Sequence, residues 1–86
     1  MKLWIDATNP APESYAWCRN FEQARILIQT LDNIRNLENF AYNDCSIDFI
    51  DFDFYLEGKL EFVNWLKETN HNYQLRAHIN DPFRKE

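Results

Sequence analysis

Three short stretches of apolar residues, each bounded by polar ones, predict β-strands at 3–5, 47–54 and 73–79. The middle stretch changes its pattern, because Ile47 and Phe49 fall on one face of a strand and the apolar residues after them fall on the other. Either a β-bulge or a strand that ends near Asp51 would explain this change. The last stretch ends before Pro82, since proline cannot donate to a sheet.

Two further stretches have apolar residues at helical spacing, at 21–35 and 58–68. Asn20 is a good N-cap for the first, and Gln23 follows it at capping-box spacing. Two prolines mark 7–14 as a loop. The connection at 36–44 is polar, with room for a short extended piece at 40–42.

The order strand, helix, strand, helix, strand predicts an α/β fold, β-α-β-α-β, with a parallel sheet and right-handed crossovers. In such sheets ligands bind outside the carboxyl ends of the strands. Four residues that can carry acid–base chemistry lie at those ends: Asp6, Asp51, Asp53 and His78. We therefore expect these carboxylates and the imidazole to meet at one edge of the sheet.

The composition of the chain argues against several classes of function. The chain has 86 residues, enough for the single domain that we expect over 1–86. A net charge of -5 argues against direct binding of nucleic acid, and one glycine is too few for a phosphate-binding loop. Cys18 and Cys45 form no CxxC pair, so they provide no start for a zinc site and are expected to be small core or loop residues. The apolar runs are too short to cross a bilayer, which indicates a cytoplasmic protein without membrane contact. We expect its thiols to be reduced, and we expect no cofactor.

The strand ends resemble the cyclic-phosphate processing receiver-like domains, relatives of response-regulator receivers. In that family the first strand ends in two aspartates followed by a basic residue; here Asp6 matches, and Ala7 and Asn9 stand at the other two positions. The DFDF sequence at 51–54 resembles the family's Asp-His-Asp-Leu-Gly, with phenylalanine in place of histidine. The sequence 58–66 is similar to the family's following helix, and HINDP at 78–82 resembles its His-Ser-x-Asn-Pro.

This resemblance implies a small three-layer receiver-like fold with a short parallel sheet of three or four strands and two main helices. It also implies phosphodiester chemistry on a small cyclic phosphate, carried by Asp6, Asp51, Asp53 and His78. His78 would be an acid or base, and Asp51 or Asp53 would orient it or hold a divalent metal. Arg76 shares parity with His78 and is a candidate phosphate contact. The differences from the family pattern remove many of the basic and proton-transferring side chains that this chemistry needs.

Aromatic and acidic residues are concentrated in the same part of the chain. A phenylalanine at position 52 would make a phosphate site apolar, and exposed aromatics beside acids are typical of protein-binding surfaces. The candidate binding residues are Phe52, Phe54 and Tyr55, with Asp48, Glu57 and Glu61. An ordinary solvated acidic face is the alternative interpretation of the same residues.

The leading hypothesis is therefore a non-catalytic protein-binding module derived from a receiver-like phosphodiesterase domain. Its expected partner is a protein with a basic, nucleic-acid-binding surface, or a second copy in a homodimer. A small acidic chain of this kind also fits an inhibitor from a phage or mobile element, for instance an anti-CRISPR. The alternative is a reduced phosphodiesterase acting on a small cyclic phosphate. Phosphoacceptor signalling fits poorly, because position 7 is alanine and no lysine ends the third strand.

Overall fold

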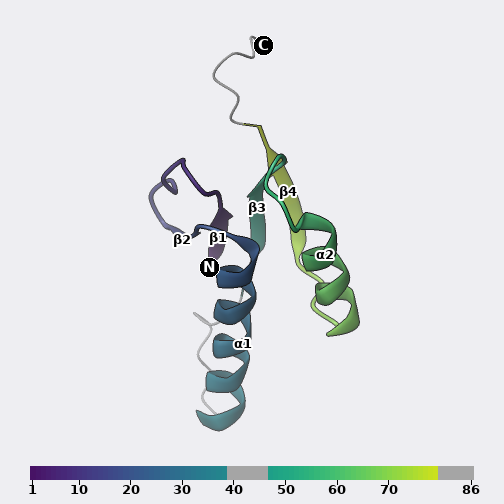
Figure 1. Cartoon of the computed structure of the whole chain (residues 1–86). Coiled ribbons are helices and arrows are strands. Elements are labelled where there is room, and N and C mark those ends of the chain that lie inside the picture. Colours follow the sequence, from purple (N-terminus) through teal and green to yellow (C-terminus); the bar gives the residue numbers. More distant parts are fainter. Residues whose placement is uncertain (39–46, 80–86) are drawn as a thin grey trace.

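The computed structural model describes residues 1–38 and 47–79, and the side chains of 1–34 and 47–79 (Figure 1). The elements follow in the order β1 (Lys2–Ile5), β2 (Tyr15–Cys18), α1 (Phe21–Glu38), β3 (Phe49–Asp53), α2 (Lys59–Glu68) and β4 (Gln74–His78). The predicted α/β class, with a parallel sheet and two helices, is confirmed. The extended piece expected at 40–42 and the predicted role of Cys45 lie outside the described residues.

All four strands are parallel, in the order β2-β1-β3-β4. The strand β2 is the one that the sequence pattern did not locate. The register sets Trp4 of β1 beside Asp51 of β3, and Asp53 beside His78 of β4. Because the strands run in the same direction, the ends of β1, β3 and β4 lie at one edge of the sheet.

One face of the sheet forms the core with the helices. Alternation along β1 and β3 sends four apolar side chains to this face: Leu3, Ile5, Ile50 and Phe52. Phe52 is 9% exposed, and its ring centroid lies 6.0 Å from that of Phe21 on α1. The prediction that Phe52 belongs to an exposed aromatic surface is therefore wrong, because the alternation of side chains along β3 places Phe52 in the core.

The change of pattern near Ile47 needs no bulge. Ile47 is buried in the same core, but β3 begins only at Phe49. From Phe49 to Asp53 the strand alternates regularly, so Phe49 and Asp51 share the face opposite the core.

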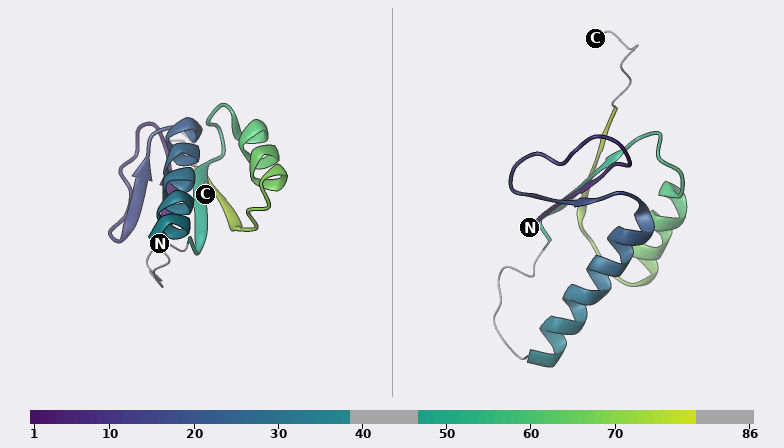
Figure 2. Two further views of the ribbon diagram at one scale, coloured as in Figure 1. Left: turned by 90° about the horizontal axis from the view of Figure 1, so that it is seen from below. Right: turned by 60° about the vertical axis from the view of Figure 1, so that its left-hand side comes forward.

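Both helices begin as local sequence dictates. At the start of α1, the Gln23 N–H donates to Asn20 Oδ1 at 2.8 Å, and the Arg19 N–H donates to Gln23 Oε1 at 2.8 Å. The helix continues to Glu38, beyond the predicted end at 35. Gly58 precedes α2 with φ of 92°, a left-handed conformation that favours glycine. The two helices contact each other, as Figure 2 illustrates.

The opposite face of the sheet carries aromatic rings and cations. Lys2 Nζ lies 5.5 Å from the ring centroid of Tyr15, and Arg76 Cζ lies 4.7 Å from that of Phe49. At its carboxyl edge, the loop after β1 folds back so that the carbonyl of Asn9 accepts a hydrogen bond from Trp4 Nε1 at 2.9 Å. Among the described residues, neither helix has the length and apolar character needed to cross a membrane.

Candidate functional site

A cluster of three polar side chains lies at the carboxyl edge of the sheet. His78 Nε2 is 2.9 Å from Asp6 Oδ2, and His78 Nδ1 is 2.5 Å from Asp51 Oδ1. Asp6 is 0% exposed and Asp51 is 4% exposed. We call these three residues the polar cluster. It joins side chains from three strands: Asp6 follows β1 directly, Asp51 is the middle residue of β3, and His78 is the last residue of β4.

Trp4 covers the imidazole of the polar cluster. The Trp4 ring stacks on the His78 ring with centroids 3.9 Å apart and an interplanar angle of 6°. Trp4 and Asp51 lie side by side in the register of β1 and β3, which brings the indole over the cluster. The stacked indole therefore fixes the plane of His78 while the two carboxylates fix its rotation.

The loop after β1 satisfies the carboxylate of Asp6. Its Oδ1 accepts hydrogen bonds from the Asn9 N–H at 2.9 Å and the Thr8 N–H at 3.0 Å. Burial alone raises the pKa of Asp6, but the hydrogen bonds from Asn9 and Thr8, together with that from His78, outweigh it and hold the pKa well below the ordinary value. Asp6 is therefore ionised at neutral pH.

The hydrogen-bond partners of His78 define which groups donate and which accept in the polar cluster. An ionised carboxylate only accepts, so His78 Nε2 carries a proton and donates it to Asp6. His78 Nδ1 faces a second carboxyl group, with Asp51 Oδ1 at 2.5 Å. Two carboxyl groups therefore flank a single imidazole, so acidic groups outnumber basic groups in the polar cluster.

Two of the other predicted site residues do not join the polar cluster. Asp53 faces the same side of β3 as Asp51, but its Oδ1 accepts a hydrogen bond from the Tyr55 N–H at 3.1 Å, which stabilises the turn after the strand. The Arg76 guanidinium lies over the Phe49 ring. Among the described residues no hydrogen bond joins either group to His78, although Asp53 is its direct neighbour across β3 and β4.

The residues after β3 are exposed, as predicted for Phe54 and Tyr55. Their exposed fractions are 44% and 59%, and their rings pack edge to face with centroids 5.2 Å apart. Leu60, in the first turn of α2, is 70% exposed. Lys59 Nζ lies 3.9 Å from the Phe54 ring centroid and donates to the Phe54 carbonyl at 3.2 Å. We call Phe54 and Tyr55 the Phe54 surface.

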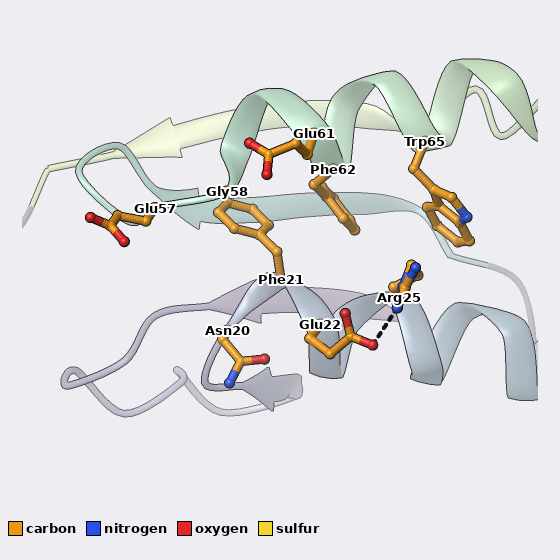
Figure 3. A pocket seen from close by; sticks show the side chains of 9 residues that line it. All are labelled: Asn20, Phe21, Glu22, Arg25, Glu57, Gly58, Glu61, Phe62 and Trp65. Atoms are coloured by element: carbon orange, nitrogen blue, oxygen red, sulfur yellow. Dashed lines mark hydrogen bonds and ion pairs between the residues drawn. The ribbon is translucent and has the colours of Figure 1, made fainter.

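The three acidic residues predicted for binding lie in two places. Asp48 pairs with the N-terminal ammonium of Met1 at 3.1 Å. Glu57 and Glu61 instead line a groove of about 310 Å³ between the first turns of α1 and α2 (Figure 3). We call it the helix groove, and its lining is Asn20, Phe21, Glu22, Arg25, Glu57, Gly58, Glu61, Phe62 and Trp65.

Sequence reasoning did not find the helix groove. In the sequence, Phe62 and Trp65 make the apolar face of α2 wider than its contact with the sheet requires. That excess was the available signal, because an apolar face wider than its core contact leaves rings at the boundary. Phe21 contributes from α1, and only the contact between the two helices brings these rings together.

Within the described residues, no group of three or more His, Cys, Asp or Glu side chains has an arrangement suited to a metal ion. Comparison of the chain with protein-family models, with curated proteins and with solved structures finds no match in any of the three.

Proposed function

We propose that this chain is a non-catalytic protein-binding module. The observation that carries the proposal is the engagement of both imidazole nitrogens of His78 by carboxylates. In this arrangement His78 has no nitrogen left for a reacting group, and Trp4 covers one side of its ring. The polar cluster also holds two carboxyl groups, one of them the ionised Asp6, against a single imidazole, which disfavours a phosphate.

The Phe54 surface is the proposed contact with the partner. Large apolar side chains that stay exposed next to one another are typical of interaction sites, and tyrosine is frequent among residues that dominate binding energy. The Phe54 N–H donates to the His78 carbonyl at 2.9 Å, so the backbone under this surface is held by β4. A rigid support of this kind lowers the entropic cost of binding.

The charge of the chain favours a basic partner. A net charge of -5 attracts cationic surfaces and speeds encounter with them. Proteins that handle nucleic acid present such surfaces. An inhibitor from a phage or mobile element, of the anti-CRISPR kind, would use this complementarity, and a second copy of the chain is the other candidate partner.

The test is a comparative capture experiment in extract of the native host. The three baits are wild type, a Phe54→Ser/Tyr55→Ser variant, and an Ile26→Ser/Ile34→Ser variant that removes exposed apolar side chains from α1. We expect a partner that the wild type and the α1 variant retain and that the Phe54/Tyr55 variant loses. The same set of proteins on all three baits would contradict the proposal.

A reduced phosphodiesterase is the second candidate, because two of the carboxylates that match the receiver-like family, Asp6 and Asp51, lie within hydrogen-bond distance of the matching His78. In this reaction water would form a new P–O bond, one ring P–O ester bond would break, and the leaving oxygen would take a proton. His78 would have to give up one carboxylate partner to take part.

Ring opening of a 2′,3′-cyclic nucleotide, followed by ³¹P NMR, separates the two candidates. We expect no rate above that in buffer for wild type. A rate that disappears in a His78→Asn variant, with circular dichroism unchanged, would make the polar cluster an active site and would replace the binding proposal.

A further inference from the structure

The helix groove has an aromatic floor. The ring centroids of Phe21 and Phe62 are 5.0 Å apart, and those of Phe62 and Trp65 are 6.1 Å apart with nearly parallel planes. Figure 3 shows these rings between α1 and α2, with glutamate side chains along the margins. Phe21 and Phe62 are only 7% and 4% exposed, so the floor offers a narrow strip of their ring surface beside the partly buried Trp65, inside a groove about the size of one long side chain or a short peptide turn.

The margins of the groove are acidic. Three carboxylates, of Glu22, Glu57 and Glu61, against the one guanidinium of Arg25 give the lining a net charge of -2. The Glu22 carboxylate accepts a hydrogen bond from Arg25 Nη2. Glu57 and Glu61 make no hydrogen bond or ion pair with another side chain across the described part of the chain, so the negative charge is concentrated beside the N-terminus of α2.

We propose that the helix groove receives an arginine side chain of a protein partner, flanked there by apolar residues. The methylene stem would lie along this floor, mainly on the partly buried Trp65 ring, and the guanidinium would reach Glu57 and Glu61. An aromatic floor favours a cation, and a carboxylate margin favours a donor with several N–H groups. Arg25 and Glu22 form the same pairing within the chain. The inference rests on the proposed protein-binding function and states which partner chemistry it uses.

Two capped eight-residue peptides test this proposal directly. Both alternate leucine with a second residue, which is arginine in one and its neutral isostere citrulline in the other. On titration into the ¹⁵N-labelled chain, we expect the arginine peptide to shift the amide signals of Gly58 and Glu61 and the indole signal of Trp65. The citrulline peptide should have an affinity at least about tenfold lower than that of the arginine peptide. Equal binding of both peptides, or shifts confined to another surface, would overturn the proposal.

Two double variants separate groove binding from general attraction to an acidic protein. Glu57→Gln/Glu61→Gln should weaken the arginine peptide about fivefold, since two exposed ion pairs are lost. Glu13→Gln/Glu68→Gln removes the same charge from exposed positions outside the groove lining and should change binding less than about twofold. Equal losses in the two variants would contradict a specific site.

The outcome is independent of the Phe54 surface. A Phe54→Ser/Tyr55→Ser variant should bind the arginine peptide like wild type, so a failed capture experiment and an empty groove are distinguishable. Concentration-dependent broadening of the Trp65 indole signal without peptide would assign the groove to a second copy of this chain and would overturn the proposed occupant.

Discussion

The two faces of the sheet have opposite chemistry although neighbouring residues of the same strands form them. On the helix side, Leu3 and Ile50 are completely buried among apolar side chains. On the other side, Trp4 and Asp51 are their direct neighbours in sequence and belong to a hydrogen-bonded cluster. Parallel sheets are usually covered on both faces by helices. Here stacking and a short loop bury the carboxylates at one edge, and the rest of that face holds rings and cations.

The largest difference between the two faces should appear in stability. Ile50→Ala removes a fully buried side chain from the helix side and should lower the free energy of unfolding by about 3 kcal/mol. Phe49→Ala removes a larger but partly exposed ring from the other face and should cost only about 1 kcal/mol. Urea denaturation of the two variants measures both values. Equal losses would mean that the second face is as well packed as the first, and would break the comparison.

The same alternation explains how far the fold follows from sequence. Both helices appear because long periodic stretches agree with the burial they produce. The strand predicted at 47–54 appears as the shorter β3, Phe49–Asp53, over the part that alternates regularly. The strand β2 escaped prediction, because YAWC is four residues long and follows a loop with two prolines. It forms by pairing with β1, which is a tertiary effect that no local pattern contains.

The candidate site divides in a similar way. The convergence of Asp6 and His78 follows from strand ends in a parallel sheet. Asp51 lies in the middle of β3 and joins them because its side chain is on the same face of the sheet as that of His78. The stacking of Trp4 and the occupation of both imidazole nitrogens depend on register and rotamers, which the sequence does not express. The prediction that Phe52 is exposed is wrong because the resembling motif places this residue at a site, whereas the alternation of β3 points its side chain into the core.

A pH-dependent loss of stability should be specific to the polar cluster. The folded-state pKa of Asp6 lies below its ordinary value, so the ionised carboxylate stabilises the fold. This contribution is complete above about pH 5, where an unfolded aspartate is also fully ionised, and it is lost as pH falls through the ordinary pKa toward the folded pKa. Asp6→Asn should therefore cost about 2 kcal/mol at pH 7 and progressively less below about pH 5.

An Asp48→Asn variant is the matched control for this prediction. Asp48 is an exposed partner of the N-terminal ammonium, so its removal should cost at most about 0.5 kcal/mol at pH 7. Guanidinium chloride titrations at a series of pH values give both differences. A gap between wild type and Asp6→Asn that stays constant down to pH 2 would show that the substitution acts through packing and not through charge.

The smallest effect should come from the cation over the ring on the second face. Arg76→Gln should lower the free energy of unfolding by about 0.5 kcal/mol, because the Arg76 guanidinium lies over Phe49 but stays exposed to water. The same substitution in a Phe49→Leu background should cost almost nothing. The difference between the two, a double-mutant cycle measured by urea denaturation, isolates the interaction.

The size of that coupling reports the surroundings of the whole second face. In water a cation over a ring contributes little, whereas a desolvated pair contributes about 2 kcal/mol or more. A coupling near the lower value at all protein concentrations means that this face is stable while exposed, as the comparison requires. A coupling that rises with protein concentration means that a second copy covers the face, and the contrast between a covered and an uncovered side of the sheet would then be a property of the monomer alone.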